Sequence, residues 1–240
     1  MGLKIWDTED GAPPARTEPT GFDVVGRFRA GYQAGTKGVA LSEYFVTTGD
    51  PDVAKRIEEL LGSKEDEGVI DYAEDDNAYG VFTPVSEIDI IIPTPKALRS
   101  RMVRWVNGKL LWVSDGETIS WPEDRAGEPS PQAGLSLQDR KQAARDEVGE
   151  KPETSILFYL AADENLGQFR FQSGSWDLAG DIVYFNTEEE LATIDGPAHC
   201  TLTLEEVSFT AKKGPRAGKV VTYTKPVLKV NGPAKDESTD

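Results

Sequence analysis

The segment from Ile156 to Ile194 carries the clearest structural pattern in this chain. Residues 156–160 form a nearly continuous apolar run, a polar stretch follows at 163–167, and residues 169–171 alternate between apolar and polar side chains. This order predicts a strand, a turn and a second strand. Ser175 then predicts the start of a helix, because its hydroxyl can accept a hydrogen bond from a first-turn backbone amide.

A second helix is predicted directly after the first. Asn186 is a favourable capping residue, and glutamates at 188–190 place carboxylates in the first turn, where the helix dipole stabilises them. Apolar residues follow Ser175 at helical spacing, so we expect that helix to pack on the sheet. The segment contains no catalytic pattern, and it therefore specifies a shape rather than a reaction.

A hairpin and a helix are predicted nearer the N-terminus. Residues 22–29 and 39–47 alternate well enough for two strands around a glycine-rich turn. Asp50 is the expected N-cap of a helix, since Pro51 suits the first helical position and Gly62 is a natural stop.

More strands are expected later in the chain. The acidic segment from Ser63 to Asn77 is interpreted as a solvated loop. Asn107-Gly108 is the strongest short hairpin signal, and here it joins two strand-like runs at 102–106 and 109–113. A charged segment starting near Ser136 is expected to form a surface helix with a weak apolar face of Leu137, Ala144 and Val148. Two long strands, at 201–211 and 219–230, are predicted around a basic tip at 212–219.

These elements predict an α+β fold, mainly antiparallel sheet with a few packed helices, and a partly closed barrel of the OB kind is one arrangement open to it. We expect a flexible arm at 1–21, one domain at 22–230 and a disordered tail at 231–240. If the domain divides in two, the proline-containing connection at 117–135 is the expected boundary.

The charge balance restricts the partners. The 240-residue chain has 42 acidic and 26 basic residues and a net charge of -16. Such a chain repels a phosphate backbone at long range, which argues against a DNA-binding protein that depends on its overall field. A soluble acidic surface is the simpler interpretation, and a dedicated DNA mimic is a weaker one. No apolar run reaches membrane length and no signal peptide is evident, so we expect a cytoplasmic protein.

Catalytic and metal-binding patterns are also missing from the sequence. His199 and Cys200 are the only histidine and cysteine, so neither an intramolecular disulfide nor a Cys/His zinc site can form within one chain. As neighbours on a strand they point to opposite faces, which predicts a buried thiol beside a surface imidazole. No nucleophile elbow, phosphate loop or zinc-protease motif occurs. We expect no enzyme activity, metal or cofactor.

Basic and aromatic residues concentrate at 99–112, where arginines and Lys109 lie close to Trp105 and Trp112. Such a patch can bind single-stranded nucleic acid, or it can be a packed tryptophan pair with a solvated basic rim, which we favour. It can also be a docking surface, because arginine and tryptophan are enriched at interface hot spots. Together with the hairpin at 27–32 it gives the predicted partner-binding residues: Arg27, Arg29, Tyr32, Arg99, Arg101, Arg104 and Trp105.

Three segments, at 26–62, 97–116 and 156–179, resemble the recombination directionality factors of actinobacterial temperate phages. The resemblance extends from about Gly26 to Val230. It implies a protein that binds the phage's large serine integrase, in particular its zinc-ribbon and coiled-coil region, in the cytoplasm of the bacterial host. It further implies that this contact redirects the integrase from integration (attP with attB) to excision (attL with attR), and that DNA is contacted only through the integrase.

An acidic protein without a catalytic set suits this role, because it complements a basic, DNA-bound partner. The alternative is a phage single-stranded DNA-binding or replication accessory protein, which would use Arg99, Arg101, Arg104, Trp105 and the basic tip.

Overall fold

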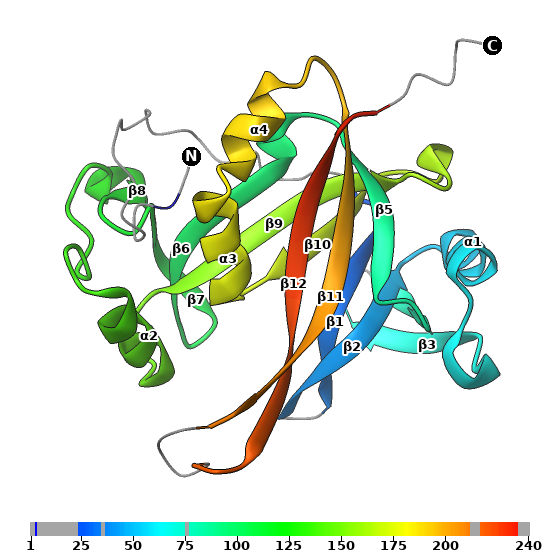
Figure 1. The fold of residues 1–240 in the computed structure, drawn as a ribbon, viewed down its shortest axis with the longest axis horizontal. Helices are drawn as coiled ribbons and strands as arrows, with labels where there is room; N and C mark the ends of the chain where they lie inside the picture. The colour runs from blue at the N-terminus through cyan, green and yellow to red at the C-terminus, as the bar shows by residue number, and fades with distance from the viewer. Residues whose placement is uncertain (1–2, 4–23, 35–36, 75–76, 212–216, 235–240) are drawn as a thin grey trace.

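The computed structural model describes Leu3 and residues 24–34, 37–74, 77–211 and 217–234. In these residues the strands join in one twelve-stranded, mostly antiparallel sheet accompanied by four α-helices (Figure 1). The predicted α+β class is confirmed, and the described strands do not close into a barrel. No described helix is long and apolar enough to cross a membrane.

The strands, in chain order, are β1 Gly26–Ala34, β2 Lys37–Thr48, β3 Val69–Glu74, β4 Asn77–Phe82, β5 Glu87–Ile92, β6 Leu98–Val106, β7 Lys109–Ser114, β8 Ile119–Trp121, β9 Lys151–Leu160, β10 Phe169–Ser173, β11 Ala198–Thr210 and β12 Val220–Pro233. The helices are α1 Pro51–Leu61, α2 Leu137–Arg145, α3 Trp176–Tyr184 and α4 Thr187–Thr193.

Strand β9 is the branch point of the sheet. One edge of β9 pairs with β10, and the order then continues through β1, β2 and β4 to β3. Its other edge pairs with β6 over residues 151–156 and with β5 at 159–160. The sheet therefore divides into a β6-β7-β8 wing and a β5-β11-β12 wing.

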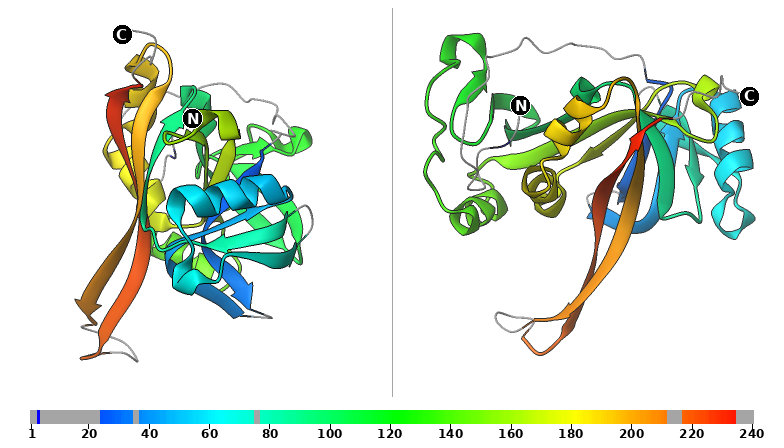
Figure 2. Two further views of the ribbon diagram at one scale, coloured as in Figure 1. Left: turned by 90° about the vertical axis from the view of Figure 1, so that its right-hand side faces the viewer. Right: turned by 45° about the horizontal axis from the view of Figure 1, so that its top comes forward.

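The β5-β11-β12 wing crosses over the first part of the sheet and encloses the core (Figures 1 and 2). The Tyr44 hydroxyl of β2 donates a 2.8 Å hydrogen bond to the Leu202 carbonyl of β11, which ties the two layers together. Between them, Phe28 packs edge-to-face against Phe158 and Phe169. Beyond the core, β11 and β12 continue as a long ribbon that extends away from the body of the molecule.

Local sequence signals account for most of these elements. Asp50 caps α1 by accepting the Asp52 amide at 2.8 Å, and Ser175 caps α3 through the Leu178 amide at 3.2 Å. The predicted Asn107-Gly108 hairpin is confirmed, with both residues at positive φ. The hairpin β9–β10 is confirmed as well.

Two local predictions are wrong, and a third is confirmed only in part. The segment 63–77 is not a loop throughout, because β3 runs along its second half and forms the edge of the sheet beside β4. Asn186 is the N-cap residue of α4, as predicted, but its side chain makes no capping hydrogen bond and its backbone is left-handed, with φ of 53°. In α2, Arg140 is buried with Ala144, whereas Val148 is exposed.

Two buried charged side chains hold the segment between β7 and β9. Glu150 is fully buried and accepts hydrogen bonds from the indole N–H of Trp112 and from the hydroxyls of Ser114 and Ser130. Arg140 donates to the carbonyls at 116 and 135 and pairs with the carboxylate at 117. These bonds fasten the proline-containing connection to the β6-β7-β8 wing, because a buried charge needs such partners.

The pair at 199–200 behaves as predicted. Cys200 is buried in the core, and His199 lies on the outer side of β11 within 3.7 Å of Asp89. Burial, with a smaller contribution from the negative charge of Glu190, raises the pKa of the Cys200 thiol to about 12.

The chain ends are described only in part. Leu3 is buried against Met102, Ala179 and Val183, whereas the rest of the predicted arm lies outside the described residues. The basic tip also lies outside them at 212–216. Strand β12 continues three residues beyond the predicted end of the strand, to Pro233.

Candidate functional site

Alternation along the central strands places arginines on the sheet face opposite the core. In β1, the buried Phe28 stands between Arg27 and Arg29, and in β10, Arg170 stands between two buried phenylalanines. Because successive side chains of a strand point to opposite faces, these arginines leave the core on the same side of the sheet.

The strand register extends this row across the sheet. Arg27 is the register partner of Arg170 in the parallel pair β1–β10. Ser155 of β9 is opposite Gln172 on one side and Arg99 of β6 on the other. Two residues further along β6, Arg101 is opposite Glu153. We call this surface the arginine face and define it by Arg27, Arg29, Arg99, Arg101 and Arg170.

Three members of the arginine face have partners on the sheet. Arg101 donates to the Glu153 carboxylate from Nε at 2.9 Å and from Nη2 at 2.6 Å. The Nε of Arg170 donates to the Ser155 hydroxyl at 3.0 Å. The Nε of Arg29 donates to the Thr47 hydroxyl at 3.1 Å. Their side chains are therefore held in place.

Arg27 and Arg99 differ from the other three. No ion pair or side-chain hydrogen bond to another described residue engages either guanidinium. Both groups are permanently charged donors that can bind carboxylates in a bidentate manner. They are the members of the arginine face with most capacity left for a partner.

The face is hollowed into a continuous groove. A depression of about 490 Å³ is lined by Arg27, Arg29 and Arg170 together with residues 172–174. A second depression, of about 650 Å³, shares residues 172–174 and continues past Glu153 toward α2 and the start of α3. We call the two together the sheet groove.

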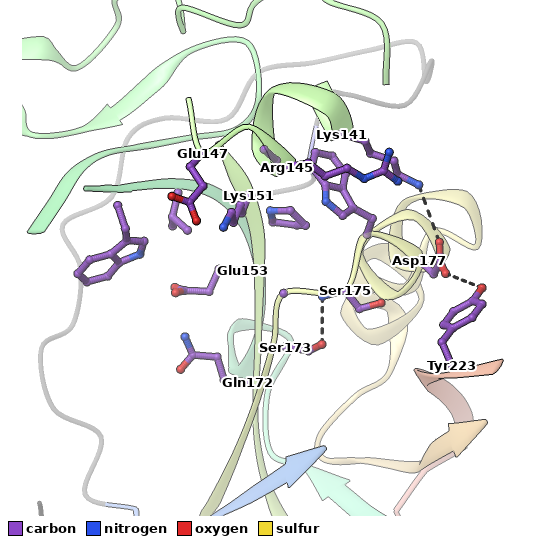
Figure 3. A pocket seen from close by; sticks show the side chains of 16 residues that line it. Lys141, Arg145, Glu147, Lys151, Glu153, Gln172, Ser173, Ser175, Asp177 and Tyr223 are labelled. Atoms are coloured by element: carbon purple, nitrogen blue, oxygen red, sulfur yellow. Dashed lines mark hydrogen bonds and ion pairs between the residues drawn. The ribbon is translucent and has the colours of Figure 1, made fainter. Parts of the chain in front are cut away.

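The second half of the sheet groove has mixed charge (Figure 3). Basic and acidic side chains both line it: Lys141, Arg145, Glu147, Lys151 and Glu153. One wall is formed where the Tyr223 hydroxyl donates to the Asp177 carboxylate at 3.1 Å. Trp105 also lines this half, with 48% of its surface exposed. An exposed tryptophan among paired charges is a surface suited to another polypeptide.

The structure therefore brings together most of the predicted partner-binding residues. Arg27, Arg29, Arg99 and Arg101 lie on the arginine face. Of these, Arg27 and Arg29 line the first half of the sheet groove, and Trp105 lines its second half. Arg104 is not available in the same way, because its Nη2 donates to the Glu147 carbonyl at 2.6 Å and supports the turn after α2.

Tyr32 joins an aromatic cluster beside Arg29. Its ring packs edge-to-face on Phe45 and Phe82, which stack on each other at 4.1 Å, and Tyr72 covers Phe45 from β3. The guanidinium of Arg29 lies 5.8 Å from the ring centre of Tyr72. The cluster thus closes one end of the arginine face.

Two features escaped the sequence-based prediction. Arg170 and Gln172 are central to the groove, and the alternation in Phe169-Arg170-Phe171 is the signal that could have identified them.

The favoured prediction that Trp105 and Trp112 pack as a pair is wrong. Trp112 donates to the buried Glu150 and lies 5.3 Å from the guanidinium of Arg125, so it supports the neighbouring connection rather than Trp105.

Comparison with known proteins adds the family. Residues 25–231 match the Gp3-like family, described as recombination directionality factor-like. No solved protein structure matches the chain. The matched region extends from the residue before β1 almost to the end of β12, so it contains the whole arginine face. The chain therefore belongs to the Gp3-like, recombination directionality factor-like family.

Proposed function

We propose that this protein is a recombination directionality factor that binds a phage large serine integrase. It switches the integrase from joining attP and attB to joining attL and attR, and it does so by protein–protein contact without chemistry of its own. Family membership supports this proposal, together with a groove whose first half is lined by three arginines in a chain with a net charge of -16.

In this proposal the arginine face is the primary contact. The guanidinium groups of Arg27 and Arg99 would bind carboxylates of the integrase, and the flanking Arg170 is already positioned by Ser155. Trp105 would add apolar contact area at the other end of the groove. Arginine and tryptophan are the residue types on which interface affinity is most often concentrated.

A polypeptide suits this groove better than a single-stranded nucleic acid. Glu153 lies on its floor, and the net charge of -16 repels a polyanion. Bases also bind by stacking on free aromatic faces, yet Phe45 is fully buried and its neighbours pack on it. The row of arginines nevertheless keeps single-stranded DNA binding as the second candidate.

Directional control needs only differential binding. A factor that binds one arrangement of the synaptic integrase more tightly than the other shifts the equilibrium by that difference in affinity. A difference of about 2.8 kcal/mol changes the preference about 100-fold. Contacts from a few arginines at one groove are of sufficient size for this effect.

The test is recombination with purified components. Integrase is incubated with attL and attR, or with attP and attB, with and without the protein. We expect excision product only when the protein is present, and reduced integration product in its presence. An integrase that behaves identically with and without the protein would contradict the proposal. Tight, salt-sensitive binding to single-stranded DNA in that case would establish the second candidate.

A further inference from the structure

A pair of adjacent aromatic residues is strongly exposed where α3 ends. Tyr184 is 79% exposed and Phe185 is 64% exposed. Their rings pack edge-to-face with centroids 5.0 Å apart. Large aromatic side chains contribute much of the affinity of protein interfaces, and two of them exposed side by side mark a contact surface more strongly than scattered ones.

The backbone holds this pair outward. The Phe185 amide donates to the Asp181 carbonyl at 2.9 Å, and the Asn186 amide donates to the Val183 carbonyl at 3.1 Å. Asn186 then adopts a left-handed conformation, with φ of 53°, which turns the chain sharply into α4. Val183 on one side and Leu191 on the other are buried, so the corner is anchored at both ends. A surface fixed in this way loses little entropy on binding.

The surroundings of the corner are acidic. Asp181, one turn earlier in α3, lies 3.6 Å from the ammonium of Lys225, so the negative charge at the corner comes mainly from the exposed Glu189 and Glu190 in the first turn of α4. Two copies of this chain that met at the corner would bring these carboxylates together, which disfavours self-association. A segment that carries lysine or arginine would instead find opposite charge and two aromatic faces suited to cation–π contact.

The corner and the arginine face lie on opposite sides of the sheet. Helix α3 packs Leu178 and Ile182 into the core with Phe169 and Phe171, whereas Arg170 between those phenylalanines points the other way. A partner element on the corner therefore does not compete for space with one on the arginine face.

We infer that the Tyr184–Phe185 corner is a second contact surface, which takes a lysine- or arginine-bearing segment of the integrase. This inference rests on the proposed function. Two contacts of opposite charge on opposite faces let one protein join two elements of its partner, and linked contacts of this kind reinforce each other. Such bridging favours whichever integrase arrangement places both elements within reach.

The test measures affinity for the full-length integrase without DNA. The variant Tyr184→Ala/Phe185→Ala is compared with Trp121→Ala, which removes a part-exposed aromatic side chain of β8 outside the sheet groove. We expect the double variant to bind at least tenfold more weakly at an unchanged melting temperature, and the control to bind within twofold of the wild type. Equal affinities of double variant and wild type, or an equal loss in Trp121→Ala, would overturn the inference.

A second set of variants tests whether the negative charge at the corner contributes to binding in addition to its apolar area. Glu189→Lys/Glu190→Lys, at exposed positions of α4, should weaken binding severalfold at low salt, with the difference shrinking as salt is added. The matched reversal Glu123→Lys/Asp124→Lys, at exposed acidic positions after β8, should leave affinity unchanged. If both reversals act alike, the corner has no specific preference for a basic segment.

The two proposals can fail separately. If the wild-type protein does not bind the integrase, the proposed function fails together with the inference. If the wild-type protein binds but the corner variants bind equally well, only the inference is refuted.

Discussion

Arg27 and Arg170 are direct register partners in the parallel pair of β1 and β10, so two guanidinium groups leave the sheet side by side. Like charges at such positions destabilise a sheet. Arg170 is held by Ser155, but no described residue neutralises Arg27. This placement lowers the stability of the folded state and leaves the Arg27 guanidinium available to a partner. Residues that break a local rule of stability are expected at functional sites.

Replacing Arg27 should therefore separate stability from binding. We expect Arg27→Gln to be neutral or to raise the free energy of unfolding by up to about 0.5 kcal/mol, because it removes repulsion from Arg170. The same variant should bind the integrase more weakly. Urea unfolding and a binding isotherm on the same sample test both effects, and a clear loss of stability would show that Arg27 has a structural role instead.

Glu150 should be critical for folding. It is fully buried and accepts hydrogen bonds from Trp112, Ser114 and Ser130. Glu150→Gln places an amide donor against these donors, and we expect a loss of about 2–3 kcal/mol. Amide hydrogen exchange should increase first in the connection at 115–149. The control Glu123→Gln, at an exposed position, should leave stability and amide exchange unchanged. Equal exchange protection of the connection in Glu150→Gln and Glu123→Gln would contradict this prediction.

Alkaline pH should destabilise the protein through Cys200. Burial raises the pKa of its thiol to about 12, so the folded state retains a proton that the unfolded state releases near pH 9. The contribution is complete below pH 9 and is lost as the pH rises toward 12, at about 1.4 kcal/mol per pH unit. The pKa of Tyr44 is also raised by burial and acts in the same direction.

Unfolding midpoints measured from pH 8 to pH 11 provide the check. The variant Cys200→Ala should show a shallower decline than the wild type, although it begins from a lower stability because a small cavity is left. The thiol should also resist a disulfide reagent until the protein unfolds. Rapid labelling of the folded protein at pH 8 would contradict the buried position.

Local signals in the sequence predicted most of the fold. Capping residues such as Asp50 and Ser175, and the Asn107-Gly108 turn, act within a few residues and are readable without tertiary information. Strand β3 was missed because it lies in an acidic stretch and its apolar residues, at 69, 70, 72 and 73, do not alternate regularly with polar ones. The buried role of Glu150 depends on donors from distant segments, and no local pattern encodes it.

The candidate site was predictable in its residues but not in its assembly. Arginines at 27–29 and 99–101 were identified in separate segments, and only the order β1-β10-β9-β6 joins them on one face. Arg170 lies between two phenylalanines in the segment 156–194, from which only strands and helices were predicted and no partner-binding residue. The exposed corner at Tyr184 and Phe185 was hidden for the opposite reason, because aromatic residues at helical spacing usually indicate a buried face.

The central claim is that the arginine face controls the direction of recombination. The most direct measurement is the yield of attL-by-attR recombination by the integrase, titrated with wild-type protein, with Arg27→Glu/Arg99→Glu, and with the control Lys55→Glu/Lys96→Glu at exposed positions outside the arginine face. We predict full excision with the wild type and the control, and at least tenfold less with Arg27→Glu/Arg99→Glu at an unchanged melting temperature. Equal excision by all three proteins would contradict the account.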